Sequence, residues 1–242
     1  MTDLMDTGER ILLEIETPLM IARHFSAYRF AKDYASNKEI LDIGCGEGYG
    51  THYLSGFARE AAGVDYDESI IDYAKNKYQK ENLSFYCLDI KNLDTLKNKF
   101  DIIYAFQVIE HLREPDKFLR DVNNLLRAGG IFVCSTPNKL DASPNSEIPL
   151  NRFHVREYLF EEFKKLMGNH FSSVQIFGLK RGKKLNFYRR LKKIGVFNFL
   201  PVAINPVKKF YAHIESSNFF ITKEGMDSAL DFIAVCKPRT YA

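Results

Sequence analysis

Short apolar runs alternate with amphipathic segments from residue 39 onward. Runs rich in β-branched and aromatic residues have the length of buried strands, and they occupy 39–43, 60–65, 83–88, 100–106, 130–135, 174–179 and 230–236. Segments with apolar residues every three or four positions predict helices, and they occupy 51–57, 68–78, 115–126 and 156–167. Because strands alternate with helices up to residue 135, the pattern predicts an α/β fold with parallel strands joined by crossover helices. The two later runs bring the predicted number of strands to seven.

Two segments lie outside this alternation. Residues 10–34 are predicted to form a helix ahead of the first strand, within an N-terminal helical lid. The insert between the last two strands is too long for an unstructured loop in a compact domain, so we expect it to form a cap. We therefore predict one domain made of a lid, a core, a basic cap insert and a last strand with a short tail, at 1–38, 39–179, 180–229 and 230–242.

The composition is typical of a soluble globular chain. Of 242 residues, 45% are hydrophobic and 27% are charged. No apolar run reaches the roughly 18 residues of a membrane-spanning helix, and the first residues lack the layout of a secretory signal, so we expect a cytoplasmic protein. Cys45, Cys87, Cys134 and Cys236 form no CxxC pair, so free thiols in a reducing compartment are expected.

Positive charge is concentrated in one part of the chain. The net charge is +3, from 34 basic and 31 acidic residues. Residues 163–214 hold twelve Lys or Arg and no Asp or Glu, so the remainder has 22 basic against 31 acidic residues, or −9. Such a block indicates contact with phosphate, nucleic acid or a membrane surface, or else a solvated basic face. In the insert, aromatic residues interleave with the basic pairs at 189–190 and 192–193, a pattern also found in segments that rest on anionic lipid.

The first predicted strand ends in a glycine-rich turn, residues 44–48 (GCGEG). Bare backbone between a strand and a helix lets a ligand approach closely, and free N–H groups with the helix dipole favour anionic atoms. Asp65 closes the second strand 21 residues after Gly44, where a carboxylate can accept both hydroxyls of a ribose. The two features together predict a nucleoside-containing ligand, and a dinucleotide would use the same acid.

Several segments, in order, resemble known sequence patterns. Five of them resemble the signature of class I S-adenosylmethionine-dependent methyltransferases: 41–48 (LDIGCGEG), 63–65 (GVD), 88–90 (LDI), 100–103 (FDII) and 125–130 (LLRAGG). Three more resemble the subgroup found among bacterial surface-polysaccharide genes: 7–10 (TGER), 135–138 (STPN) and 153–157 (FHVRE). The resemblance implies a Rossmann-like seven-stranded sheet with helices on both faces and S-adenosyl-L-methionine as cofactor.

The resemblance also implies which residues hold the methionine and ribose parts of the donor. The methionine part would be lined by the glycine turn, that is by Gly44, Cys45, Gly46 and Gly48. Asp42 would steady this turn, and Asp65 would hold the ribose. The main chain of Gln107 would contact the methionine ammonium group.

The adenine site is implied in the same way. Tyr66 and Ile90 would sandwich the adenine ring, and Asp89 would meet its amino group. Asp42 and Asp89 have a structural alternative, because aspartate beside a loop often caps a neighbouring turn.

Two histidines are candidate general bases for the transfer. The sulfonium donor is already activated, so the protein mainly aligns the nucleophile, and we expect no metal. A sugar hydroxyl must lose a proton as it attacks, whereas a phosphate or carboxylate is already anionic. Histidine titrates near working pH; His111 follows the fourth strand, and His154 opens the helix predicted at 156–167. Either could instead fix a loop.

Three further residues are candidates for binding the acceptor. Arg156 would bind a phosphate or sugar acid, although it could equally pair with Glu157 or Glu161. His24 and Tyr28 would line the acceptor pocket from the lid, although an amphipathic helix also buries such residues as packing.

We therefore expect a methyltransferase that O-methylates a sugar or glycan precursor of a capsule or O-antigen. The acceptor is expected to be an anionic small molecule or glycan, with peripheral membrane contact through the insert. The alternative is methylation of a small phosphorylated or phosphoramidate metabolite. A nucleic-acid methyltransferase is disfavoured because residues 105–108 (AFQV) lack the Pro-Pro-aromatic motif. A non-catalytic binding module and a dinucleotide dehydrogenase are further alternatives, and the oligomeric state stays open.

Overall fold

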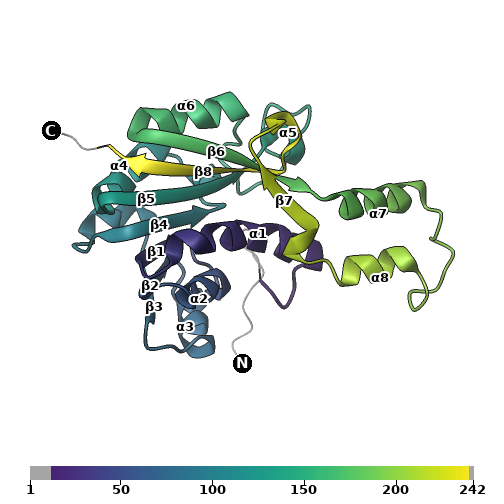
Figure 1. Ribbon diagram of the computed structural model, residues 1–242, viewed down its shortest axis with the longest axis horizontal. Helices are drawn as coiled ribbons and strands as arrows, with labels where there is room; N and C mark the ends of the chain where they lie inside the picture. Colours follow the sequence, from purple (N-terminus) through teal and green to yellow (C-terminus); the bar gives the residue numbers. More distant parts are fainter. Residues whose placement is uncertain (1–11, 240–242) are drawn as a thin grey trace.

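One mixed β-sheet runs through the chain (Figure 1). The computed structural model describes residues 12–239. The strands are β1 (Glu39–Ile43), β2 (Glu60–Asp65), β3 (Leu83–Cys87), β4 (Phe100–Phe106), β5 (Leu126–Pro137), β6 (Phe171–Arg181), β7 (Phe219–Thr222) and β8 (Asp231–Pro238). Their order across the sheet is β3-β2-β1-β4-β5-β8-β6-β7. The described chain thus forms eight strands, and the prediction of seven is corrected by β7, a short apolar run inside the insert.

The strands differ in direction between the two halves of the sheet. Strands β1 to β5 pair in parallel, so the prediction of parallel strands joined by crossover helices is confirmed for them. Strand β8 lies between β5 and β6 and is antiparallel to both, and β7 is antiparallel to β6. Strand β8 is antiparallel because no crossover helix returns the chain to the opposite end of the sheet before it begins.

Helices and short 3-10 turns connect the strands. The helices are α1 (Pro18–Ala35), α2 (Tyr49–Ser55), α3 (Glu68–Lys77), α4 (Pro115–Leu125), α5 (Lys139–Ala142), α6 (Phe160–His170), α7 (Lys183–Ile194) and α8 (Pro206–Ala212). The 3-10 turns are η1 (Ile90–Thr95), η2 (Ile109–His111), η3 (Ser216–Asn218) and η4 (Met226–Ser228). In the described chain, no helix combines the length and the apolar character needed to cross a membrane.

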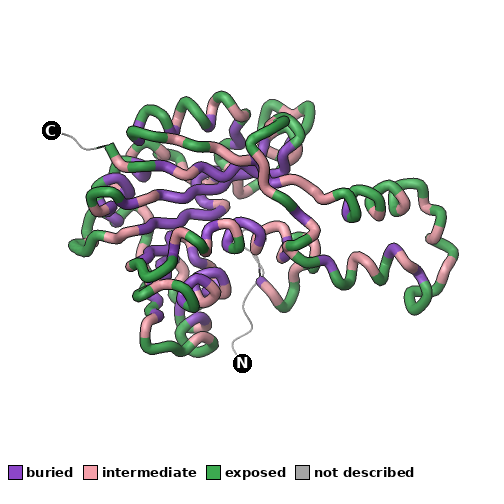
Figure 2. Tube along the Cα trace, viewed as in Figure 1, coloured by how far each residue is buried: buried purple, intermediate pink, exposed green. Residues whose placement is uncertain are grey.

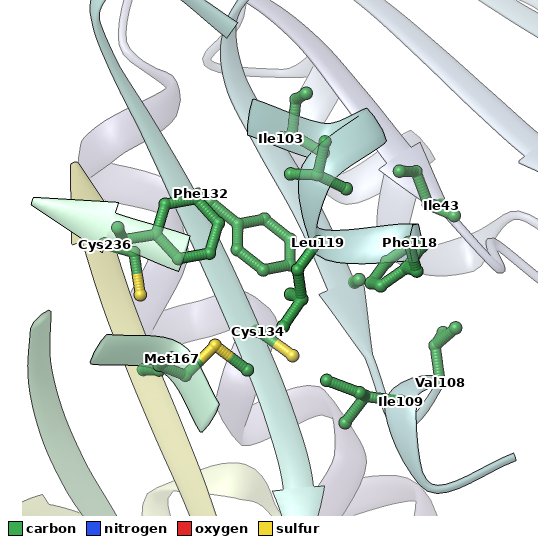
Figure 3. Packing of buried hydrophobic residues seen from close by; sticks show 14 of the residues in the cluster. Ile43, Ile103, Val108, Ile109, Phe118, Leu119, Phe132, Cys134, Met167 and Cys236 are labelled. Carbon is green, nitrogen blue, oxygen red and sulfur yellow. The ribbon is translucent and has the colours of Figure 1, made fainter. Parts of the chain in front are cut away.

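Each face of the sheet is buried under its own helices. Side chains alternate along a strand, so Ile102 and Tyr104 of β4 face α1, α2 and α3, whereas Ile103 faces the opposite layer. That opposite layer packs α4 and α6 onto the sheet, as Figure 3 shows for Phe118 and Met167. Burial on both faces explains why the strands read as nearly continuous apolar runs.

Helix α1 packs directly against the sheet. It begins at Pro18, where the Thr17 side chain accepts a hydrogen bond from the amide of Met20. The predicted helix is thus wrong for residues 12–17, and the start of that prediction lies outside the described residues, as does the motif at 7–10. Tyr104 Oη donates to the Ala31 carbonyl at 3.2 Å, which fixes α1 across β4.

Helix α6 begins later than predicted. The Glu162 side chain accepts from the amide of Leu159, so the helix starts at Phe160 rather than at Arg156. His154 therefore lies in the loop ahead of α6 and does not open the helix.

The insert projects from the sheet rather than covering it. Helices α7 and α8 extend sideways from the core in Figure 1, and Figure 2 shows most of their length as exposed or half-buried. We call residues 183–212 the arm. The two helices pack on each other through stacked rings of Tyr188 and Phe210, 4.0 Å between centroids. Leu185 and Ile214 anchor the arm in a small apolar cluster beside the sheet. The described residues thus form an arm where the pattern predicted a cap.

Candidate functional site

A cavity of about 530 Å³ lies at the carboxyl ends of the central strands. Its walls come from the glycine turn after β1, the ends of β2, β4 and β5, one side of α1 and the loop before α6. This edge of an open α/β sheet is where such folds bind ligands. None of the described residues that line it belongs to the arm.

The glycine turn brings bare backbone to the cavity. The amides of Gly44 and Cys45 both donate to the Val64 carbonyl, at 2.8 and 3.0 Å, which folds the turn over the end of β2. Gly44 has φ +72°, and a Cβ there would lie 2.6 Å from Val108 Cγ2. A side chain at residue 44 would therefore be strained and would clash. Gly44, Cys45 and Gly46 line the cavity.

Gly48 has a different role. It is the N-cap of α2 with φ +86°, and a Cβ would meet the Phe85 ring at 2.7 Å. It lies outside the cavity lining, so its place is in the packing of the turn rather than at the ligand surface.

Asp65 joins the glycine turn to β2. Its Oδ2 accepts from the Gly46 amide at 3.0 Å, and its Oδ1 accepts from the Asp67 amide at 3.2 Å. The residue is buried, yet it lines the cavity, so a carboxylate is held at the cavity wall in a fixed orientation. The sequence placed this residue correctly at the end of β2.

The residues predicted for adenine gather on the same side. Tyr66, Asp89 and Ile90 all line the cavity, and Tyr66 is largely exposed. Asp89 also caps η1, because its Oδ1 accepts from the Lys91 amide at 2.9 Å. The structural alternative for Asp89 is thus confirmed, because the residue caps a turn. Since it also lines the cavity, contact with the adenine amino group stays a prediction.

Asp42 lies beneath the turn and outside the cavity lining. Its Oδ2 accepts from Thr51 Oγ1 at 2.7 Å and from Tyr28 Oη at 3.1 Å, whereas Oδ1 has no hydrogen-bond partner among the described residues. Burial raises the pKa of Asp42 from 3.8 to about 7. Tyr28, expected in the acceptor pocket, is instead a buried support for Asp42.

The raised pKa of Asp42 predicts a loss of stability with rising pH. Between about pH 4 and 7 the folded chain holds a proton that the unfolded chain releases, so the free energy of unfolding falls through this window. Asp42→Asn removes the titration. The stability of the variant relative to the wild type should therefore increase by about 2 kcal/mol from pH 5 to pH 8, measured by urea unfolding. Asp94→Asn, on exposed η1, is the control, and an equal pH dependence in all three proteins would contradict the assignment.

The lid side of the cavity holds a charged pair that sequence analysis missed. Arg23 of α1 donates from Nε and Nη2 to the two carboxylate oxygens of Asp231, at 2.8 and 2.7 Å. Both residues line the cavity, 208 positions apart in the chain, and no local sequence pattern links them.

Gln107, with φ +57°, also lines the cavity and donates from Nε2 to Ser135 Oγ at 3.2 Å. Beside them His24 contacts Tyr49 Oη, and burial lowers the pKa of His24 to about 4, which keeps it neutral.

His111 and His154 meet in the cavity. Their ring centroids are 5.0 Å apart in an edge-on arrangement, and both residues line the cavity. His111 donates from Nδ1 to the Phe153 carbonyl at 3.0 Å. Since a carbonyl can only accept, the proton of the neutral ring is on Nδ1 and the lone pair is on Nε2.

The protonation of His154 is fixed by its neighbours in the same way. The amide of Phe153 donates to Asn151 Oδ1 at 3.0 Å, which turns the Asn151 amino group toward His154 Nε2, also at 3.0 Å. Nε2 therefore accepts, and Nδ1 donates to Glu157 Oε1 at 2.8 Å. Both ring nitrogens of His154 are thus occupied by the protein itself.

Two buried glutamate side chains complete this side of the site. Glu110 Oε2 accepts from Thr136 Oγ1 at 3.1 Å, while Oε1 has no partner among the described residues. Burial raises the pKa of Glu110 to about 8, so the side chain is mostly neutral at pH 7. Glu157 is buried behind His154. Neither was predicted as a site residue.

Arg156 is not brought to the cavity. It donates to Glu162 Oε1 at 3.0 Å, and its side chain is exposed on the outer side of the loop. The structure thus favours an ion pair, although with Glu162 rather than with the partners considered from the sequence.

A metal ion would find one group of suitable donors here. Ligating atoms of Glu110, His111 and His154 lie within 4.8 Å of one another. A metal at this position would displace a hydrogen bond of His154, because both of its nitrogens already have partners. The arrangement is therefore better suited to holding and moving a proton, and the expected absence of a metal stays a prediction.

Comparison with known proteins gives consistent matches. Residues 35–190 match a family model described as a methyltransferase domain. A protein of Mycobacterium tuberculosis named a probable S-adenosylmethionine-dependent methyltransferase is 33% identical over 182 residues, which cover 74% of this chain and 65% of that protein. The ubiquinone biosynthesis O-methyltransferase of Coxiella burnetii is 36% identical over 135 residues, 55% of either chain. The chain thus spans 55–65% of the length of these relatives.

Solved structures show the same fold. The N-methyltransferase NodS from Bradyrhizobium japonicum, in complex with S-adenosyl-L-homocysteine, superposes with a TM-score of 0.60. The superposition covers 93% of this chain and 90% of that one, at 15% sequence identity. At this identity the likeness concerns the α/β Rossmann-like fold alone.

Proposed function

Since this chain belongs to the family of methyltransferase domains, we propose that it is a class I S-adenosylmethionine-dependent methyltransferase. The proposed acceptor is a hydroxyl oxygen of a neutral, polyhydroxylated molecule such as a sugar or glycan precursor. The observation that carries the proposal is the imidazole of His111 in the cavity, with its proton fixed on Nδ1 and its lone pair on Nε2. An acceptor that is already anionic would need no such group.

The residues around the glycine turn would hold the donor. Tyr66, Asp89 and Ile90 line the cavity where the adenosyl part would bind. Asp65 would accept from the ribose hydroxyls, and the main chain of Gln107 would contact the methionine part. S-adenosyl-L-methionine supplies the activated methyl group on its sulfonium. The chain's own residues fix the line from acceptor oxygen to methyl carbon and keep water out, which is the main source of rate in a displacement of this kind.

The proton balance gives each histidine a role. As the oxygen–carbon bond forms and the sulfur–carbon bond breaks, the hydroxyl proton passes to His111 Nε2, leaving a methyl ether and S-adenosyl-L-homocysteine. His154, hydrogen-bonded to Glu157 and edge-on to His111, is a positioning residue. The buried Glu157 carboxylate keeps the Nδ1 proton of His154 in place.

The charges around the cavity favour a neutral acceptor over an anionic one. Among the described lining residues there are six carboxyl side chains, one arginine and one lysine. The arginine, Arg23, has its Nε and Nη2 donating to Asp231. Asp231 is paired with this arginine, and Glu110 is mostly neutral at pH 7. Asp65 and Asp89 belong to the proposed donor side. A phosphorylated acceptor would therefore find no unpaired guanidinium among the described lining residues, and this, rather than the number of acids, disfavours it. This observation places the phosphorylated metabolite behind the glycan, and it does not support the expectation of an anionic acceptor.

A role in surface-polysaccharide biosynthesis rests on the motif that supplies the loop of the site. Residues 153–157 (FHVRE) provide His154 and Glu157. The resemblance of this motif to polysaccharide-associated methyltransferases thus concerns residues at the cavity.

The acceptor can be identified by labelling. The enzyme and methyl-labelled donor are incubated separately with neutral oligosaccharides, sugar phosphates, a primary amine and transfer RNA. We expect label in the neutral saccharides, as a product that survives mild alkali, because methyl ethers resist alkali and methyl carboxylate esters do not. Label confined to the amine, to the sugar phosphates or to RNA would contradict the proposal.

A further inference from the structure

The arm ends in an exposed apolar tip. We define the tip as residues 194–204, a segment with no charged side chain. Its large apolar residues are exposed, among them Phe199 at 80% and Ile194 at 69%. Water-exposed aliphatic and aromatic residues in one short segment mark a surface that is covered by something else.

The tip is held in shape by its own contacts. Asn205 is buried; its Nδ2 donates to the Phe197 carbonyl at 2.6 Å, and its Oδ1 accepts from the amide of Val207 at 3.0 Å at the start of α8. Gly195, with φ +78°, ends α7. The exposed apolar residues are therefore presented by a fixed loop between two packed helices.

Positive charge lies directly behind the tip. The arm contains eight Lys or Arg and no Asp or Glu, and Lys192, Lys193, Lys208 and Lys209 flank the tip on its two sides, all exposed. The rest of the chain is acidic overall, so the arm is the basic extension of an acidic body.

We propose that the arm docks the enzyme on a bilayer that contains anionic lipid. The apolar tip enters the boundary between headgroups and acyl chains, and the flanking lysines bind the lipid anions. The inference goes beyond the methyl-transfer function and does not depend on which acceptor is used.

Two other partners fit the arm less well. A nucleic acid would be tracked by basic residues with aromatic side chains for base stacking, but the tip has Ile, Val, Leu and Pro beside its two phenylalanines and no charge. The acidic body of a second copy could meet the lysines, but that copy would also have to place an apolar surface against the tip, so a dimer is an outcome of the test below. A lipid surface satisfies both features at once, because apolar and anionic parts lie at adjacent depths.

Vesicle binding tests the inference with the full chain. Wild-type protein is sedimented with vesicles of phosphatidylcholine alone and with vesicles that contain about 30% phosphatidylserine. We expect at least tenfold stronger binding to the anionic vesicles, weakened by salt, because each lysine near the surface contributes to the attraction. Lack of preference for the anionic vesicles would overturn the proposal.

Matched variants separate the tip from the lysines. Phe199→Ser with Ile204→Ser removes two exposed apolar residues of the tip, and its control is Ile148→Ser with Leu150→Ser, two exposed apolar residues elsewhere. We expect the tip variant to lose at least tenfold in vesicle affinity and its control to lose none, with the affinity for S-adenosyl-L-homocysteine unchanged in the tip variant.

The charge variants follow the same design. Lys192, Lys193, Lys208 and Lys209 are replaced by Ala, and the control replaces four exposed lysines outside the arm, Lys75, Lys97, Lys99 and Lys164. Equal losses of vesicle affinity in both quadruple variants would show a general attraction of positive charge to the vesicles and would overturn the proposal. A dimer in the wild type that the tip variant dissolves, with no vesicle binding, would assign the arm to a second copy of the chain.

Fluorescence reports insertion directly, because the chain contains no tryptophan. Phe199→Trp should give emission that shifts to the blue on addition of anionic vesicles. Phe57→Trp, at an exposed position on the core, should not shift. Unchanged emission from the Phe199→Trp variant would refute insertion of the tip.

Discussion

His111→Ala is expected to lower kcat by about a hundredfold or more, because loss of a general base commonly costs at least this much. The ring is fixed by its hydrogen bond to the Phe153 carbonyl, and His111 lines the cavity. The affinity for S-adenosyl-L-homocysteine should stay within about twofold, since His111 is not among the residues proposed to hold the donor. Initial rates with the identified acceptor and calorimetry with the product nucleoside measure the two effects.

The pH profile distinguishes a base from a merely structural histidine. Wild-type kcat should fall at acid pH, because a protonated imidazole accepts no further proton, and the His111→Ala variant should lack this acid limb. His213→Ala, at an exposed position directly after the arm, is the control and should retain the wild-type rate and profile. Full activity of His111→Ala, together with inactivity of His154→Asn, would transfer the role of base to His154.

Asp65→Ala is expected to weaken donor binding by about a hundredfold. Two hydrogen bonds from the ribose hydroxyls to a carboxylate are lost, and bonds to charged groups contribute about 1.5–3 kcal/mol each, part of which water restores. The substitution also removes the acceptor for the Gly46 amide, so the glycine turn loses one of its fixed points. Calorimetric titration with S-adenosyl-L-homocysteine measures the change.

Two controls make the result for Asp65 specific. Asp94→Ala, on the exposed surface of η1, should bind the nucleoside with wild-type affinity. Thermal unfolding of Asp65→Ala without ligand shows whether the fold persists. A folded Asp65→Ala variant with undiminished affinity would mean that the ribose lies elsewhere.

The glycine turn and the position of Asp65 were predictable because local backbone chemistry determines them, whereas the other proposed donor residues came from the family resemblance. The turn at 44–48 needs glycine wherever the chain has a positive φ, and such needs are visible in a single sequence. The position of Asp65 could be predicted because the apolar pattern indicates the strand at whose end it lies. The start of α1 is likewise determined by neighbouring residues, Thr17 and Pro18. The prediction of a longer helix there overlooked this clear N-cap signal.

Residues that depend on long-range packing were not predictable in this way. Arg23 and Asp231 become neighbours only when α1 lies across the sheet and β8 has entered it. Tyr28 illustrates the opposite error: its spacing on α1 allowed either face, and only tertiary packing decided that it supports Asp42. The direction of β8 likewise depends on how the whole insert leaves the sheet and returns.

The central place of β8 has a consequence for synthesis on the ribosome. Strands β5 and β6 do not pair with each other; each pairs with β8, which contains residues 231–238. Until those residues emerge from the exit tunnel, the parallel half of the sheet and the β6–β7 pair carry open backbone edges with no partner between them. At that stage the exposed edges of the nascent chain can pair wrongly, and the sheet becomes continuous from β3 to β7 only when residues 231–238 have left the tunnel.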